Sequence, residues 1–117
     1  MTHVTHYEIA CADVDRAQRF WGGLFGWQFG ESVMPGGEYR MAQTGEQSGA
    51  ALSSMGEPGH PNVYFDVDDI EASLAKVREL GGEAGDKSPV PQMGWFAACK
   101  DSEGNAFSLW QTDSSAG

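Results

Sequence analysis

Hydrophobic and polar residues alternate at the start of the chain and then change to a helical spacing. The segment "VTHYEIAC" (residues 4–11) alternates as the residues of a half-buried strand do. Asp13 follows, and apolar residues then recur at intervals of three and four: Val14, Ala17, Phe20, Trp21 and Leu24. We expect a strand at 4–11 and a helix that begins after Asp13, because aspartate is a preferred N-cap residue. The apolar stripe of this helix is expected to face the sheet.

The same order of patterns returns in the second half of the chain. Asp13 and Asp69 are 56 residues apart, and so are Leu24 and Leu80. A second helix is predicted from apolar residues that share one helical face: Ile70, Leu74, Val77 and Leu80. Asp68 or Asp69 is expected to cap it, and the glycines at 81 and 82 are expected to end it. We infer two copies of one supersecondary unit.

Short runs of strand-forming residues, separated by glycine, proline and polar residues, follow each predicted helix. They predict strands at 27–30, 38–44 and 49–54, and at 83–86, 95–100 and 106–111. The fold expected for the chain is therefore α+β, a single domain over 1–117 made of two βαβββ modules in tandem. Its parts are module one at about 1–54, a linker at 55–61, module two at about 62–112 and a frayed tail at 113–117.

Each helix can cover only one face of its sheet, and the two open faces are expected to form a cleft. Alternation along the strands assigns these side chains to the open faces: His6, Glu8, Ala10, Asn62, Tyr64, Asp66, Ala106, Ser108 and Trp110. One of Trp95 and Phe96 is expected to join them, and the pattern does not decide which. Aromatic walls with a few polar groups suit planar organic molecules, and Glu8 or Asp66 would favour a positively charged one.

Charge and length narrow the possible classes of function. Seven basic and 17 acidic residues give a formal net charge of −10 in a chain of 117 residues. This acidity argues against nucleic acid and anionic membranes as partners, because both need a positive surface. The chain has no apolar stretch of membrane-spanning length and no secretory signal pattern, and its two cysteines do not make a disulfide framework. We expect a cytoplasmic protein whose partner is a small molecule.

Three segments together cover nearly the whole chain: "HYEIACADVDRAQRFWGGLFGW", "VYFDVDDIEASLAKVRELGG" and "GWFAACKDSEGNAFSLWQ". They resemble the vicinal oxygen chelate (VOC) superfamily, which contains glyoxalases, ring-cleaving dioxygenases and bleomycin-resistance proteins. The resemblance implies the paired-module fold and, because two-module chains of this family commonly dimerise, a homodimer. It also implies a position for a divalent metal, held by a His or Gln from the first strand of each module and a Glu from the last strand of each.

The positions of this chain that match those ligands are His6, Leu52, Asn62 and Ser108. Only His6 is a good ligand, whereas a catalytic site normally needs about three. We therefore predict no metal cofactor; a divalent transition metal, if bound, would lie at His6. A shifted set of His6, Glu8 and Asp66 is an alternative, although carboxylates on an open sheet face are more often solvated or paired with arginine.

Two functions remain open, and whether the protein is an enzyme is undecided. In the first, it is a metal-free binding protein of the bleomycin-resistance type that sequesters a small aromatic or cationic molecule. In the second, it is a lyase, isomerase or dioxygenase of the glyoxalase type, with or without a divalent metal, and His6 or Glu8 acts as the general base. The degenerate ligand set favours the first. The residues expected to line the binding site are His6, Glu8, Leu52, Asn62, Tyr64, Asp66, Trp95, Ser108 and Trp110.

Overall fold

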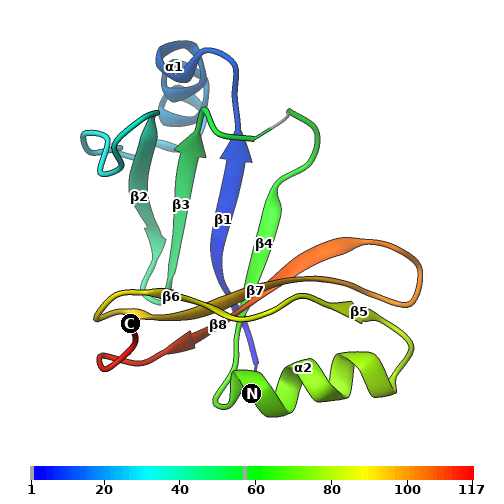
Figure 1. Cartoon of the computed structure of the whole chain (residues 1–117). Helices are drawn as coiled ribbons and strands as arrows, with labels where there is room; N and C mark the ends of the chain where they lie inside the picture. Colours follow the sequence, from blue (N-terminus) through cyan, green and yellow to red (C-terminus); the bar gives the residue numbers. More distant parts are fainter. Residues whose placement is uncertain (1, 57) are drawn as a thin grey trace. The chain divides into compact units, whose positions relative to one another are not determined.

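The computed structural model describes residues 2–56 and 58–117 (Figure 1). Met1 of the predicted module one and Glu57 of the predicted linker lie outside the described residues. Within that range the chain forms eight strands and two helices, so the predicted α+β class is confirmed. Their bounds are β1 Val4–Ala10, α1 Val14–Phe25, β2 Tyr39–Gly45, β3 Ser48–Ser53, β4 Asn62–Asp66, α2 Ile70–Glu79, β5 Glu83–Ala84, β6 Ser88–Val90, β7 Gly94–Lys100 and β8 Ala106–Thr112.

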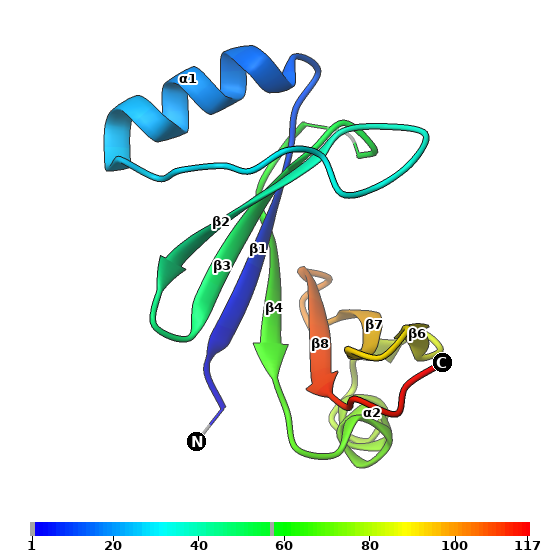
Figure 2. The same ribbon diagram turned by 90° about the vertical axis from the view of Figure 1, so that its left-hand side faces the viewer.

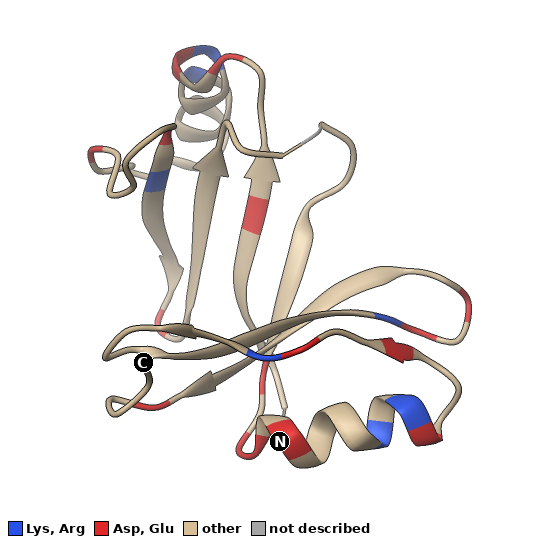
Figure 3. Ribbon diagram, in the orientation of Figure 1, with Lys and Arg blue, Asp and Glu red and all other residues tan. Residues whose placement is uncertain are grey.

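The chain divides into two compact units. The N-terminal unit comprises Thr5–Asn62, and the C-terminal unit comprises 63–117 together with residues 2–4. Acidic residues are spread over both units, in both helices and in the connecting loops (Figure 3). Neither helix of the described chain is long and apolar enough to cross a lipid bilayer.

In the N-terminal unit the strand order is β2-β3-β1, with β1 parallel and β2 antiparallel to β3. Glu8 pairs with Ala51, and Ile9 pairs with Leu52. Because paired residues share a face, Ile9 and Leu52 lie on one face and Glu8 lies on the other. Arg40 pairs in register with Leu52, and its side chain donates a hydrogen bond to Gln18 of α1, so α1 lies on the Leu52 side of this sheet (Figure 2).

Helix α1 begins as predicted, because the Asp13 side chain accepts a hydrogen bond of 3.0 Å from the Arg16 amide. It ends at Gly26, whose φ of +73° is a left-handed conformation that glycine adopts readily. The expected burial of the apolar stripe is only partly correct. Val14 is buried, but Phe20 and Leu24 are 59% and 57% exposed.

In the C-terminal unit the strand order is β4-β8-β7-β5, and β6 also pairs with β7. The β4–β8 pair is parallel and the pairs made by β7 are antiparallel. Asp69, rather than Asp68, caps α2 by accepting 3.1 Å from the Ala72 amide. The core of this unit lies between α2 and the sheet: Ile70, Leu74, Ala97, Cys99 and Leu109.

Three local expectations differ from the structure. Residues 27–30 do not form a strand. This segment makes only isolated backbone hydrogen bonds to β2, such as the one from the Gly30 amide to the Met41 carbonyl, and not a continuous ladder. An additional strand, β6, forms around Pro89, a residue that sheets tolerate at an edge. The tail is not frayed: the Asp113 amide donates to the Met93 carbonyl, and the carbonyl of buried Ala116 accepts from Gln92. The strict βαβββ pattern is therefore not reproduced strand for strand.

Candidate functional site

Three polar side chains gather on the face of the N-terminal sheet opposite α1. His6 and Glu8 extend from β1, and Tyr39 extends from β2. The Tyr39 hydroxyl donates a hydrogen bond of 2.6 Å to Glu8 Oε2 and lies 3.0 Å from His6 Nε2. The direct separation of His6 Nε2 and Glu8 Oε2 is 3.9 Å, so Tyr39 links the two residues.

The intervening strand allows this contact because its residues on that face are small. Gly49 pairs with His6, and Ala51 pairs with Glu8. A side chain from β2 can therefore extend across β3 and reach β1. A Cβ atom placed on Gly49 would lie 3.8 Å from His6 Nδ1, which puts this ring nitrogen beside the glycine.

Burial lowers the pKa of His6, and the charge of Glu8 raises it by less. The imidazole is therefore neutral at neutral pH. The 2.6 Å bond from Tyr39 to a carboxylate is short, as charge-assisted hydrogen bonds are. A neutral imidazole held next to a phenol and a carboxylate has the chemistry needed to accept and return a proton.

The open face of the C-terminal unit combines aromatic rings with a carboxylate. Tyr64 pairs with Ser108 across β4 and β8, and Asp66 pairs with Trp110. Phe96 of β7 pairs with Trp110 from the other side. Four of the six open-face residues predicted on β4 and β8 therefore share one face: Tyr64, Asp66, Ser108 and Trp110. Tyr64 and Ser108 are buried, whereas Asp66 and Trp110 are half-buried.

The Trp110 ring lies close to Gly94 of the neighbouring strand β7. A Cβ atom on Gly94 would stand 2.5 Å from Trp110 Cζ2, so only glycine leaves room for the indole in this position. The indole Nε1 donates a hydrogen bond of 3.0 Å to Thr112 Oγ1. Two contacts thus hold the ring in one orientation, which is the pre-organisation that a stacking surface for a ligand requires.

Trp95 was predicted to line the binding site, but it does not lie on this face. It pairs with Gln111 and packs against the core on the α2 side of the sheet. Its Nε1 donates 3.0 Å to Asp113 Oδ2, and Lys87 Nζ lies 4.3 Å from its ring centroid. The register of β7 and β8 places Phe96, the alternative to Trp95, on the open face beside Trp110.

Leu52 is also misplaced by the sequence argument. It is fully buried and pairs with Ile9, on the face opposite His6. Glu8 and Tyr64 are the matching residues of the two first strands, 56 residues apart. Glu8 pairs with Ala51 and Tyr64 pairs with Ser108, so the matching residues of the two last strands are 57 residues apart. The true counterpart of Ser108 is therefore Ala51. Asn62 is the first residue of β4 and the last of the N-terminal unit.

The residues at the four family metal positions do not fit a divalent metal. One imidazole, one amide and one hydroxyl provide a weak donor set, and neither Leu52 nor the register-corrected Ala51 has a donor atom. Within residues 2–56 and 58–117 no cluster of three or more His, Cys, Asp or Glu side chains could hold a metal ion.

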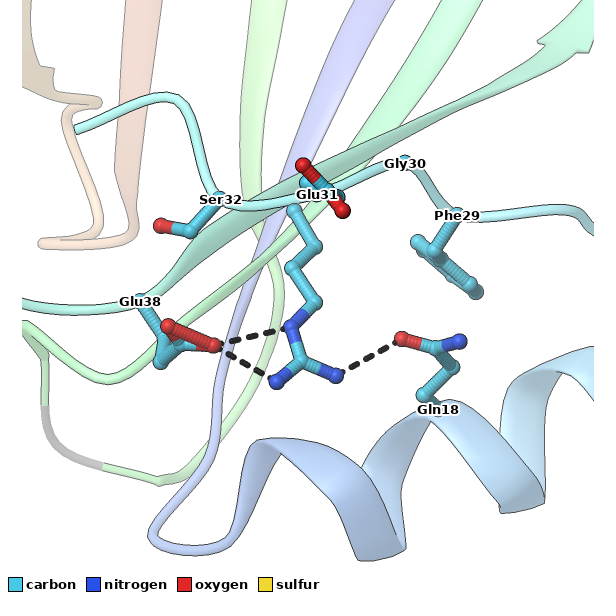
Figure 4. Close-up of a pocket in the computed structure, with 7 residues that line it drawn as sticks. Gln18, Phe29, Gly30, Glu31, Ser32 and Glu38 are labelled. Carbon is cyan, nitrogen blue, oxygen red and sulfur yellow. Dashed lines mark hydrogen bonds and ion pairs between the residues drawn. The ribbon is translucent and has the colours of Figure 1, made fainter.

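A hollow of about 410 Å³ lies between α1 and the edge strand β2 (Figure 4). Arg40 lies in it and makes ion pairs with Asp15 at 2.9 Å and Glu38 at 2.6 Å. Gln18 Oε1 accepts a further hydrogen bond of 2.9 Å from the same guanidinium. The bonds to Glu38 and Asp15 raise the pKa of Arg40, and the two carboxylates offset its charge. The hollow is therefore unsuited to an anion.

Sequence reasoning missed Tyr39 and Gly94, and it left Phe96 undecided. Tyr39 lies in a strand that was expected, but its contact with β1 depends on the order β2-β3-β1, which alternation within one strand does not give. A possible signal was the run "SGAALS" of small residues in β3, over which a long side chain can pass. Gly94 could not have been recognised without the cross-strand register that brings it to Trp110.

Known proteins match this chain over most of its length. The model of the glyoxalase-like domain family matches residues 6–110. A curated relative from Mycobacterium bovis, named "Putative glyoxylase CFP32", is 31% identical over 91% of this chain and 44% of its own length. The chain thus spans less than half the length of the curated relatives it matches.

Solved structures show the same fold at low sequence identity. The hypothetical protein BH1468 of Bacillus halodurans has a TM-score of 0.76 at 18% identity, with 99% of this chain and 98% of that chain covered. Methylmalonyl-CoA epimerase of Mycobacterium tuberculosis has a TM-score of 0.72 at 17% identity, with 94% and 87% covered. A Vibrio splendidus member of the glyoxalase/bleomycin resistance protein/dioxygenase superfamily has a TM-score of 0.68 at 20% identity, with 97% and 100% covered. This chain belongs to the glyoxalase-like domain family.

Proposed function

We propose that this protein binds a small, planar, positively charged organic molecule on the open face of its C-terminal unit, as a sequestering protein of the resistance type. The observation that carries the proposal is the fixed indole of Trp110, which pairs with Asp66 on one side and Phe96 on the other. A planar ring can stack on an aromatic side chain for about 0.5–1.5 kcal/mol. A positive charge on that ring gains a further ~0.5–2 kcal/mol over the indole face.

Charge supports a cation over an anion as the ligand. Asp66 provides a carboxylate next to the stacking ring, and the whole chain carries a formal charge of −10. A long-range negative potential concentrates cations near the surface before they bind.

The test is a pair of probes that share a ring system but differ in charge: 1-methylquinolinium and quinoline at neutral pH. Binding is followed by quenching of intrinsic tryptophan fluorescence. We expect the cation to bind more tightly than the neutral ring, and Asp66→Asn to abolish that difference. Asp86→Asn, which removes one exposed carboxylate from the loop between β5 and β6, is the matched control. Equal binding of both probes to the wild-type protein would contradict the proposal.

A second function is favoured by the cluster of His6, Tyr39 and Glu8. We propose as the alternative that His6 acts as a general base in a lyase or isomerase of the glyoxalase type, without a metal. The structural neighbours include methylmalonyl-CoA epimerase, so methylmalonyl-CoA in D2O is a suitable probe. Exchange of its acidic C–H for deuterium, read by proton NMR, should occur with the wild-type protein and with His60→Ala, and be lost with His6→Ala. Absence of exchange with the wild-type protein would remove this alternative for that substrate.

We further propose that the protein is a cytoplasmic homodimer. Support comes from the exposed apolar side chains on α1: Phe20, Leu24 and Phe25. Contiguous exposed apolar surface often marks an interaction site. Light scattering coupled to size-exclusion chromatography should give twice the chain mass for the wild-type protein and a lower mass for Phe20→Ser. A wild-type monomer at high concentration would contradict the dimer.

A further inference from the structure

We propose that Tyr39 is a positioning residue that holds His6 in the tautomer with its proton on Nε2, which makes Nδ1 the proton-accepting nitrogen of the ring. The observations are the 2.6 Å bond from the Tyr39 hydroxyl to Glu8 and the 3.0 Å contact between that hydroxyl and His6 Nε2. This inference deepens the second proposed function, in which His6 is a base. The tautomer itself does not depend on that function.

The direction of the hydrogen bonds among Tyr39, Glu8 and His6 follows from the number of protons that each group can donate. A carboxylate can only accept hydrogen bonds, and a phenol has a single proton to donate. Glu8 takes that proton, so the Tyr39 oxygen must act as the acceptor toward His6. The proton of the 3.0 Å contact must therefore be on His6 Nε2, and a neutral imidazole with its proton there has its lone pair on Nδ1.

The opposite polarity is unfavourable. If Tyr39 donated to His6, its oxygen lone pairs would face the Glu8 carboxylate at 2.6 Å without a proton between them. His6 also cannot satisfy Glu8 by itself, because the 3.9 Å from Nε2 to Oε2 exceeds a hydrogen bond. Tyr39 is therefore the link that relates the charge of Glu8 to the position of the imidazole proton.

The consequence for chemistry is a choice between the two ring nitrogens. With the proton on Nε2, the basic lone pair belongs to Nδ1, on the side of the ring beside Gly49 of β3. A general base must present its lone pair to the proton it removes, so the tautomer decides which side of His6 a substrate must approach.

The test is a long-range proton–nitrogen NMR correlation spectrum of the histidine rings at neutral pH, which distinguishes a protonated from an unprotonated ring nitrogen. The His6 signals are assigned by their loss in His6→Gln. In the wild-type protein the Nε2–H form should exceed the Nδ1–H form by about tenfold, which corresponds to about 1.4 kcal/mol. Tyr39→Phe should reduce this ratio, whereas Tyr7→Phe should not, because Tyr7 lies on the opposite face of β1.

Two results would overturn the inference: a wild-type His6 protonated on Nδ1, or a tautomer ratio unchanged by Tyr39→Phe. If Tyr39→Phe fails to fold, Glu8→Gln serves instead, because an amide no longer dictates which way the Tyr39 hydroxyl donates. An unchanged ratio in Glu8→Gln would then count against the inference. Failure of the second proposed function looks different: the deuterium exchange would be absent while the tautomer spectrum remained as expected.

Discussion

Replacement of Gly94 by alanine should damage the C-terminal unit and its aromatic face together. The added Cβ would lie 2.3 Å from the Gln111 carbonyl oxygen and 2.5 Å and 2.8 Å from Trp110 Cζ2 and Cη2. All three separations are shorter than carbon contacts allow, and the first involves backbone. The strand pair β7–β8 and the indole must therefore both shift.

The magnitude follows from the cost of overpacking. Added methyl groups in close-packed regions typically destabilise by about 1–3 kcal/mol, and a backbone clash favours the upper part of that range. We expect Gly94→Ala to lower the free energy of unfolding by about 2–3 kcal/mol in urea titrations. The fluorescence of Trp110 should change as well, because its ring leaves the backbone of β7.

Gly23→Ala is the matched control. Gly23 lies inside α1, and an added Cβ would meet no atom within 4 Å. Alanine is favoured over glycine in a helix by up to about 1 kcal/mol, so this variant should be more stable than the wild-type protein. A Gly94→Ala protein within about 0.5 kcal/mol of the wild-type stability would refute the packing argument. The same close packing of Trp110 on Gly94 fixes the orientation of the indole.

Two further predictions concern the pH dependence of stability and the tail. Burial lowers the folded pKa of His6 below its unfolded value of 6.5, so the unfolded chain binds more protons and stability falls as the pH drops below 6.5 toward the folded pKa. His6→Gln should remove this pH dependence of the free energy of unfolding, whose slope is at most about 1.4 kcal/mol per pH unit. If the urea midpoints of the two proteins changed identically with pH below 6.5, the prediction would be contradicted. Asp113 accepts hydrogen bonds from Ser115 and Trp95, so Asp113→Ala should release residues 113–117 and speed their removal by carboxypeptidase. Ser114→Ala is the control, and equal cleavage rates would show that Asp113 does not hold the tail.

Local signals in the sequence were sufficient to predict most helices and strands, but they did not always give the sheet face on which a strand residue lies. Asp13 and Asp69 cap their helices as expected, because a cap involves only residues within one helical turn. The face of a strand residue depends on register, and a shift of one residue exchanges the two faces. That is why the ungapped offset of 56 selected Leu52 where the structure has Ala51.

Contacts across several strands were beyond prediction from one sequence. Phe96, rather than Trp95, meets Trp110 only because of the β7–β8 register. The Tyr39 hydroxyl reaches β1 only because β3, which lies between, carries small residues on that face. The exposure of Phe20 on α1 also departs from the periodic pattern, since a hydrophobic stripe does not reveal how closely its helix packs on the sheet.

We expect the open face of the C-terminal unit to bind a planar cation through Trp110 and Asp66. Isothermal titration calorimetry of 1-methylquinolinium against the wild-type protein, Trp110→Ala and Trp27→Ala tests it most directly, since Trp27 lies in the N-terminal unit. Measurable binding is expected for the wild-type protein and for Trp27→Ala, with an affinity loss of about tenfold or more in Trp110→Ala, or about 1.4 kcal/mol. Wild-type affinity in Trp110→Ala, or a loss of the same size in Trp27→Ala, would contradict a cation site at Trp110.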